Sequence, residues 1–169
     1  MTNQMKTQLL LTNNTMNIKE LTLKPSKTNN SKLSTQITSF QNLLTQLRGR
    51  SLPTSEIEFI NQQIDVINSF NGAEKDLMKT IKSSVKSILK QVEKSVKIVT
   101  KGYYRNLYMA IGIGAFGVPF GVAFSAALDN YAFIGVGMPI GMSIGIAIGA
   151  QMDEKAKKEG RQLDVEMSL

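Results

Sequence analysis

The sequence predicts an all-α protein in which an amphipathic helical bundle, or a long helical hairpin, is followed by a two-helix transmembrane hairpin. Three observations lead to this fold class. Apolar residues recur at helical spacing between residues 32 and 101, residues 106–152 carry a single formal charge, and small residues recur every four positions in that apolar stretch. Spacings of three and four residues are typical of a helix with one buried face, and a long uncharged stretch is typical of a membrane span.

The composition divides the chain into four expected regions. Residues 1–31 are polar and rich in Asn and Thr, so we expect a disordered segment, with an attached helix near Met16–Leu23 as an alternative. Residues 32–101 form the amphipathic helical region, residues 102–152 the transmembrane hairpin, and residues 153–169 a charged C-terminal tail.

Three helices are predicted in the amphipathic region. The first covers residues 32–48, the second begins at Thr54 after Pro53, and the third covers about residues 73–101. The third helix has the most regular pattern, close to a heptad repeat, and we expect it to lead directly into the membrane. Its apolar residues are Met78, Ile81, Val85, Ile88, Val92, Val96 and Val99. An antiparallel three-helix bundle would cover this apolar face, and so would a long hairpin that dimerises.

Two transmembrane helices are predicted after that region. Neither residues 106–128 nor residues 131–152 include a charged side chain. Each segment has about 22 residues, and a rise of 1.5 Å per residue makes it long enough to cross a hydrocarbon core of about 30 Å. The only polar break between them is Asp129-Asn130, which is long enough for a tight turn.

Each predicted transmembrane helix carries small residues along one face, the pattern called a glycine zipper. The first face has Ala110, Gly114, Gly117, Gly121 and Ser125, and the second has Gly137, Gly141, Gly145 and Gly149. Small residues let helix backbones approach closely in lipid, where no hydrophobic force drives helices together. We therefore expect these residues to form helix–helix contacts and to promote assembly of a homo-oligomer.

A repeated frame places a proline near the middle of each apolar segment. The sequences GVPFGV (117–122) and GMPIGM (137–142) put Pro119 and Pro139 at nearly equal distances from the turn, and therefore at one depth. Each proline removes a helix hydrogen bond and frees the carbonyl four residues earlier, at Ala115 and Gly135. Two interpretations remain open: matched kinks that serve packing, or a hinge or polar ring in a pore.

Basic residues flank the apolar hairpin on both sides. They are Lys94, Lys97, Lys101 and Arg105 before it and Lys155, Lys157, Lys158 and Arg161 after it. By the positive-inside rule, both termini are expected in the cytoplasm and Asp129 outside. The basic residues are also expected to contact anionic lipid headgroups. The net charge of +7 also raises the question of nucleic acid, but no aromatic interleaving or binding motif supports that partner.

The composition does not favour an enzyme. The chain has no Cys, His or Trp, so thiolate ligands, cysteine nucleophiles and the commonest general base are missing. No catalytic, metal-binding or cofactor-binding residue is predicted, and no cofactor is expected. The Leu9–Leu11 run is shorter than the apolar core of a signal peptide, so no secretory signal is predicted either.

The apolar stretch has a family resemblance. The residues YYRNLYMAIGIGAFGVPFGVAF and IGVGMPIGMSIGIAIGAQMDEKAKKEG, within about residues 103–163, resemble small bacterial glycine-zipper membrane proteins. This resemblance implies membrane residence and self-association. It assigns no functional residue beyond the zipper glycines.

Taken together, these features and the resemblance predict an oligomeric integral membrane protein of a bacterial inner membrane. Its hairpin would anchor a cytoplasmic helical domain that recruits or scaffolds protein partners. Two alternatives remain open: a small pore- or channel-forming protein, such as a toxin, a holin-like protein or a defence effector, and a secreted toxin whose hairpin inserts into a target membrane.

Overall fold

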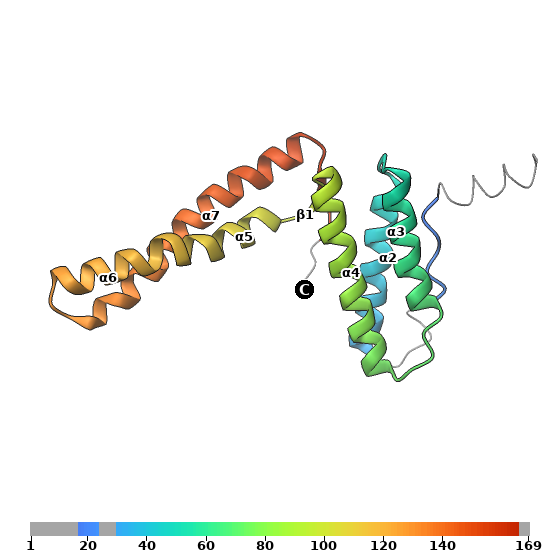
Figure 1. Ribbon diagram of the computed structural model, residues 1–169, viewed down its shortest axis with the longest axis horizontal. Coiled ribbons are helices and arrows are strands. Elements are labelled where there is room, and N and C mark those ends of the chain that lie inside the picture. The colour runs from blue at the N-terminus through green and yellow to red at the C-terminus, as the bar shows by residue number, and fades with distance from the viewer. Residues whose placement is uncertain (1–16, 24–29, 166–169) are drawn as a thin grey trace, which may run out of the picture. The chain divides into compact units, whose positions relative to one another are not determined.

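The computed structural model describes residues 17–23 and 30–165, which belong to two compact units. One unit ends at Lys97 and the other begins at Ile98 (Figure 1). The described residues are mostly helical, with one short pair of strands, so the all-α prediction is confirmed. Each unit is described separately below.

The first unit contains three helices around one apolar core. They are α2 (Ser31–Arg48), α3 (Thr54–Asn68) and α4 (Glu74–Val96), and α4 packs against both of the others. Asn30 caps the first turn of α2, because its side-chain oxygen accepts the backbone N–H groups of Lys32 and Leu33. The most deeply buried side chains include Leu33, Phe40, Leu43, Leu44, Leu47, Ile60, Ile64, Ile67, Ile81, Ile88 and Val92.

The third helix is shorter than its sequence predicts. It ends at Val96, and Lys97 adopts a left-handed conformation with φ of 57°. The β-branched Ile98 and Val99 that follow are buried, and Val99 belongs to a strand. The expectation of a helix that continues through residue 101 into the apolar segment is therefore wrong, because Val99 and Thr100 pair as a strand with Gln162 and Leu163.

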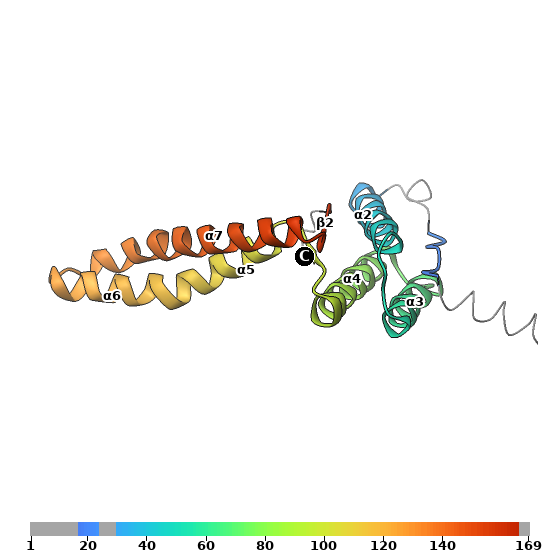
Figure 2. The ribbon, with the colours of Figure 1, turned by 90° about the horizontal axis from the view of Figure 1, so that it is seen from above.

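The second unit is an antiparallel helical hairpin (Figure 2). Its outgoing rod consists of α5 (Tyr103–Gly112), the π-helical turn η2 (Ile113–Gly117) and α6 (Val118–Ala127). After a short 3₁₀ turn, η3 (Tyr131–Phe133), helix α7 (Ile134–Lys158) returns alongside all three segments of the rod.

The hairpin turn is closed by local backbone geometry. Asp129 follows the end of α6 with φ of 47°, and the Asn130 N–H reaches back to the Ser125 carbonyl at 3.1 Å. This is the Schellman arrangement that ends many helices. The Asn130 side chain then accepts the Ala132 N–H at 2.9 Å and starts the next turn. Two polar residues therefore complete one helix end and begin the next.

The base of the hairpin is closed by a two-stranded parallel pair. Strand β1 (Val99–Thr100) lies beside β2 (Gln162–Leu163), and the Val99 N–H donates to the Arg161 carbonyl at 3.0 Å. Leu163 and Ala156 are fully buried at this end. Residues 153–158 continue α7, so no element boundary coincides with the expected start of a charged tail at residue 153.

The described part of the N-terminal region is ordered and not helical. Residues 17–23 run beside α3 in an irregular, extended conformation (Figure 1). Ile18 and Leu21 are buried there, so the expectation of disorder, or of a helix near Met16–Leu23, does not describe residues 17–23. The rest of that expectation concerns residues 1–16 and 24–29, which lie outside the described residues.

Candidate functional site: the glycine seam of the apolar hairpin

The two rods of the hairpin meet along a face of small residues, which we call the glycine seam. Every member of the seam is buried. The outgoing rod contributes Gly112, Gly117, Gly121 and Ser125, and α7 contributes Gly137, Gly141, Gly145 and Gly149. Seven of the eight positions were predicted as packing residues from the sequence, and the exception is Gly112.

Backbone meets backbone along the seam. A Cβ atom added at Gly141 would lie 2.6 Å from the Cα atom of Gly117, and one added at Gly149 would lie 2.5 Å from the Cα atom of Arg105. A Cβ atom at Gly145 would overlap the Tyr108 carbonyl. Carbon atoms do not approach so closely, so no residue larger than glycine fits these positions without movement of a helix. Contacts of this kind favour weak Cα–H···O interactions.

The seam is an internal contact of one chain. The four-residue series of α7 faces the outgoing rod of the same hairpin, so it is not available to a second copy. The expected homo-oligomer would therefore need another surface. Gly114 and Gly135 have open space where a side chain would point, and Gly114 lies outside the seam although the sequence predicted it there.

The π-helical turn explains why Gly112 takes the place expected for Gly114. A uniform α-helical rotation puts Gly114 near the face of Gly117 and Gly121. In the π turn, the Val118 N–H bonds to the Ile113 carbonyl, five residues earlier, and one extra residue is accommodated. As a result Gly112 and Gly117, five positions apart, share one face. A regular helical period cannot reveal this shift.

The two prolines lie at one level but in different local structures. Gly117 and Gly121 flank Pro119, and both approach Gly137, two residues before Pro139. The expectation of equal depth therefore agrees with the contacts. Pro139 lies inside the α-helical α7, whereas Pro119 directly follows the π turn, which relieves the clash between a proline ring and the preceding helical turn.

A long-range cap holds the base of the outgoing rod. The two carboxylate oxygens of Asp153, on α7, accept the backbone N–H groups of Tyr104 and Arg105, each at 3.0 Å. These amides begin α5, and its own N-cap residue, Gly102, supplies no side-chain hydrogen bond. A carboxylate at a helix N-terminus also interacts favourably with the helix dipole. The sequence gives no sign of this cap, because 48 residues separate Asp153 from Arg105.

The outer surface of the hairpin is apolar. Among its exposed large side chains are Leu107, Ile111, Phe116, Val118, Phe120, Val122, Phe124, Val136, Met138 and Ile148. The Phe116 and Phe120 rings stack with centroids 6.5 Å apart. Both rods are long and apolar enough to cross a membrane. In the most apolar 18-residue stretch of each rod, only 17% and 22%, respectively, is buried. Most of the apolar surface therefore faces outward.

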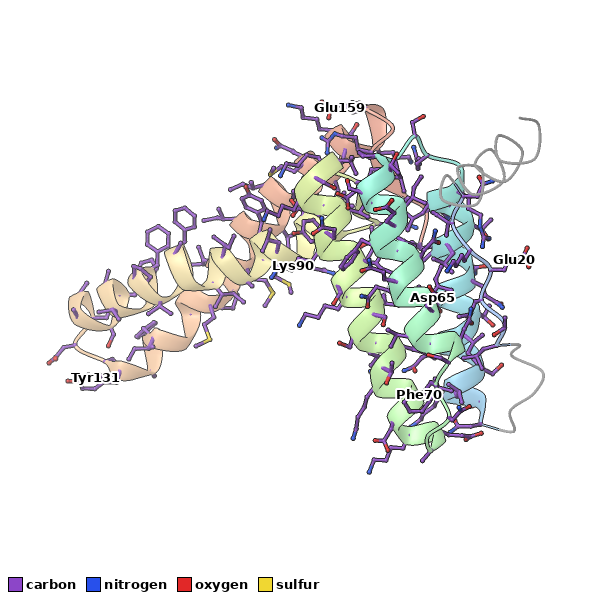
Figure 3. All side chains as sticks on the ribbon, turned by 45° about the vertical axis from the view of Figure 1, so that its right-hand side comes forward. Glu20, Asp65, Phe70, Lys90, Tyr131 and Glu159 are labelled. Atoms are coloured by element: carbon purple, nitrogen blue, oxygen red, sulfur yellow. The ribbon has the colours of Figure 1, made fainter. Side chains whose placement is uncertain are left out.

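Charge is concentrated at the base of the hairpin. The basic residues Lys101, Arg105, Lys155, Lys157 and Lys158 are all exposed at this end. Asp129 and Tyr131 lie at the opposite, turn end, where Tyr131 is 86% exposed (Figure 3). The two other basic positions predicted to contact a membrane surface, Lys94 and Lys97, are exposed at the end of the first unit. Several of these cations also pair with neighbouring carboxylates, such as Lys158 with Glu154 at 2.8 Å.

The described residues of the hairpin are characterised by packing and by charge. Within residues 17–23 and 30–165, no three potential metal-binding side chains come together. Comparisons with protein-family models, curated proteins and solved structures find no match to this chain. The seam, its apolar exterior and its charged base are therefore the observations from which a function has to be argued.

Proposed function

We propose that this chain is an integral membrane protein whose hairpin anchors a helical domain, the first unit, at the cytoplasmic face of a bacterial inner membrane. The domain recruits protein partners there. The observation that carries this proposal is the outward-facing apolar surface of the hairpin. Less than a quarter of the most apolar stretch of each rod is buried. A core helix of a soluble protein buries such a surface, whereas a membrane helix exposes it to lipid.

The dimensions of the hairpin fit a bilayer. Its outgoing rod has 25 residues, about 37 Å at 1.5 Å per residue. The hydrocarbon core is about 30 Å thick, which leaves both rod ends at the headgroups. Tyr103 and Tyr104 at one end and Tyr131 at the other suit the interfacial positions that tyrosine favours.

The charge distribution supports one orientation. Basic residues from both flanks gather at the base, and the turn has none. Under the positive-inside rule the base is cytoplasmic, and each lysine near an anionic lipid surface contributes about 1 kcal/mol to binding. The exposed lysines of α4 supply further positive charge to the same compartment.

The seam favours an anchor over a pore. A channel needs polar groups or water along its wall, but glycine backbones in direct contact close the inside of this hairpin. Its outside is lined by aliphatic and aromatic side chains. The Ser143 hydroxyl donates to the Pro139 carbonyl of its own helix at 2.8 Å, so this polar group is already satisfied.

Cysteine labelling tests insertion and orientation, because the chain has no native cysteine. Tyr131→Cys at the turn and Lys90→Cys on α4 form a matched pair, since both positions are exposed. We expect a membrane-impermeant maleimide to label Tyr131→Cys in spheroplasts, and Lys90→Cys only after the membrane is permeabilised. Release of the protein by alkaline carbonate would contradict membrane integration, and the reverse labelling pattern would contradict the orientation.

Ion flux separates the anchor from the pore alternative. We expect liposomes that contain the purified protein to leak no faster than protein-free liposomes. Flux well above the protein-free rate would replace the anchor with a pore.

Photo-crosslinking in cells tests the recruiting role of the first unit. A photoreactive residue at Lys86 should yield adducts with other proteins, whereas one at Tyr131 should yield none.

A further inference from the structure

Residues 17–23 are held by side chains from two helices, which together we call the α2–α3 face. Helix α2 contributes Gln41 and Arg48, and α3 contributes Asn61, Asp65 and Asn68. Ile18 and Leu21 are 7% and 9% exposed, so the segment buries two apolar side chains as well. Figure 3 marks Asp65 on α3 and Glu20 on the segment that this face holds.

Two asparagines bind the segment as a neighbouring β-strand would. The Asn61 side chain accepts the Lys19 N–H at 2.7 Å and donates to the Asn17 carbonyl at 3.1 Å. Asn68 makes the same two bonds three residues further along the segment. Its side chain accepts the Thr22 N–H at 2.9 Å and donates to the Glu20 carbonyl at 3.1 Å. Each amide therefore brackets one buried apolar residue.

The spacing of the asparagines matches an extended chain. Asn61 and Asn68 are seven residues apart on α3, or about 10.5 Å along the helix axis. Three residues of extended chain span about 10 Å, so both pairings are made at once. This match makes the α2–α3 face complementary to an extended peptide and not to a helix.

Most of the remaining hydrogen bonds are also made to the backbone of residues 17–23. Arg48 donates to the Ile18 and Lys19 carbonyls at 3.2 and 2.6 Å, and Gln41 donates to the Leu23 carbonyl at 3.1 Å. Specificity comes from the two apolar side chains and from the ion pair between Lys19 and Asp65 at 2.7 Å. Asn61 is only 7% exposed, so its amide would lose these partners if the segment left and nothing replaced it.

We propose that the α2–α3 face is a docking surface for an extended segment of a second copy of this chain, namely residues 17–23. The hydrogen bonds and the ion pair described above all join residues 17–23 to helices α2 and α3, so the same bonds can form whether the segment belongs to the same copy or to another. Every copy carries a segment that fits the face in charge, apolar spacing and backbone register. Exchange of an identical element is a low-cost route to a dimer. This surface would provide the self-association that the glycine seam, buried inside one hairpin, cannot.

Engineered cysteines test the exchange in the full-length chain. The Thr22 hydroxyl lies 2.9 Å from the Asn68 side-chain oxygen, so cysteines at these positions are close enough to react through a short bismaleimide. One tagged copy carries Thr22→Cys, and a second copy with a different tag carries Asn68→Cys. The two are expressed together, extracted in detergent and cross-linked. A matched control replaces Asn68→Cys by Lys82→Cys, an exposed position on α4.

We expect a heterodimer from the Thr22→Cys and Asn68→Cys pair, severalfold more abundant than from the control pair. A single chain with both cysteines shows whether the segment docks at all. If that chain cross-links internally while the mixed copies give only the control amount, the segment stays in its own copy and the proposal is wrong. If neither cross-link forms, the docked segment itself is wrong, and the proposal falls with it.

A reciprocal charge reversal gives a second test without cysteines. Lys19→Asp in one copy and Asp65→Lys in another place like charges together within each copy, but opposite charges together in both exchanged pairings. We expect each variant alone to form fewer dimers than the mixture, as measured by native mass spectrometry in detergent. A mixture with no more dimer than the average of the two variants would overturn the proposal.

Discussion

The two units of this protein use opposite means to hold helices together. In the first unit, large aliphatic and aromatic side chains such as Phe40, Ile64 and Ile88 fill the space between helices and are fully buried. In the hairpin, glycines bring the two helix backbones into direct contact, and large residues such as Phe120 and Val122 face outward. One chain thus contains a unit with large side chains inside and a unit with large side chains outside.

The difference matches the surroundings proposed for the two units, water for the first unit and lipid for the hairpin. In water, burying a large apolar side chain stabilises a fold by about 1.5–3 kcal/mol, so large residues belong between helices. In lipid that gain is absent, and close backbone approach supplies the attraction. The two units should therefore be sensitive to opposite changes. Removal of a buried side chain should destabilise the first unit, and addition of a side chain at the seam should destabilise the second.

The largest effect is expected from a one-residue deletion in α7. Deletion of Ile140 moves Val136 into the seam position of Gly137, where a Cβ atom would already lie 2.7 Å from the Cα atom of Gly121. We expect the closed hairpin to be lost. The matched deletion is Ala115, within the π turn, which would leave Gly112 and Gly117 four positions apart, as in α7. We expect this deletion to preserve the seam.

Spin labels at the exposed Ala123 and Met138 measure both deletions in detergent. The distance distribution should broaden for the Ile140 deletion and stay narrow for the Ala115 deletion. Equal broadening for both would show that the π turn does not set the register of the seam.

The next effect is a cavity in the first unit. Phe40→Ala should lower the free energy of unfolding of this unit by about 3–5 kcal/mol, because Phe40 is fully buried. Phe120→Ala, at a position that is 41% exposed on the hairpin, should change the stability of its unit by less than about 1 kcal/mol. Hydrogen exchange followed by mass spectrometry reports the two units separately. A larger effect of Phe120→Ala would argue that this ring lies in a packed interface.

A single methyl group should destabilise the seam by a smaller amount. Gly141→Ala should reduce hairpin stability by about 1–3 kcal/mol through overpacking, whereas Gly135→Ala, which meets open space, should gain up to about 1 kcal/mol from helix propensity. All four tyrosines lie in the second unit and the chain has no tryptophan, so tyrosine fluorescence follows this unit alone. Equal responses of the two variants would contradict the seam.

The smallest effect is expected at the cap. Asp153→Ala should destabilise the start of α5 by about 1 kcal/mol. Amide exchange at Tyr104 and Arg105 should become about fivefold faster. Glu154→Ala is the matched control, since no such cap depends on that exposed neighbour. Unchanged exchange at both amides would mean that the carboxylate does not hold them.

The helices of the first unit were largely predictable. Within the helix predicted over residues 32–48, five apolar residues recur at helical spacing, and all of them are buried: Leu33, Ile37, Phe40, Leu44 and Leu47. The end of α4 was not predictable, because Val99 continues the apolar spacing and yet pairs with Gln162 as a strand. Helical spacing carries no information about a partner 63 residues away.

The sequence by itself determined which stretches are helical, where the apolar hairpin turns, and that glycines line its helices. These properties depend on composition and on short-range periodicity, which a single segment carries. Only the tertiary structure decided the register of the seam, the choice of Gly112 over Gly114, the cap from Asp153, and the binding of residues 17–23 by Asn61 and Asn68. Each of these depends on atoms of distant segments meeting at a few ångströms, and no local pattern in the sequence encodes such a meeting.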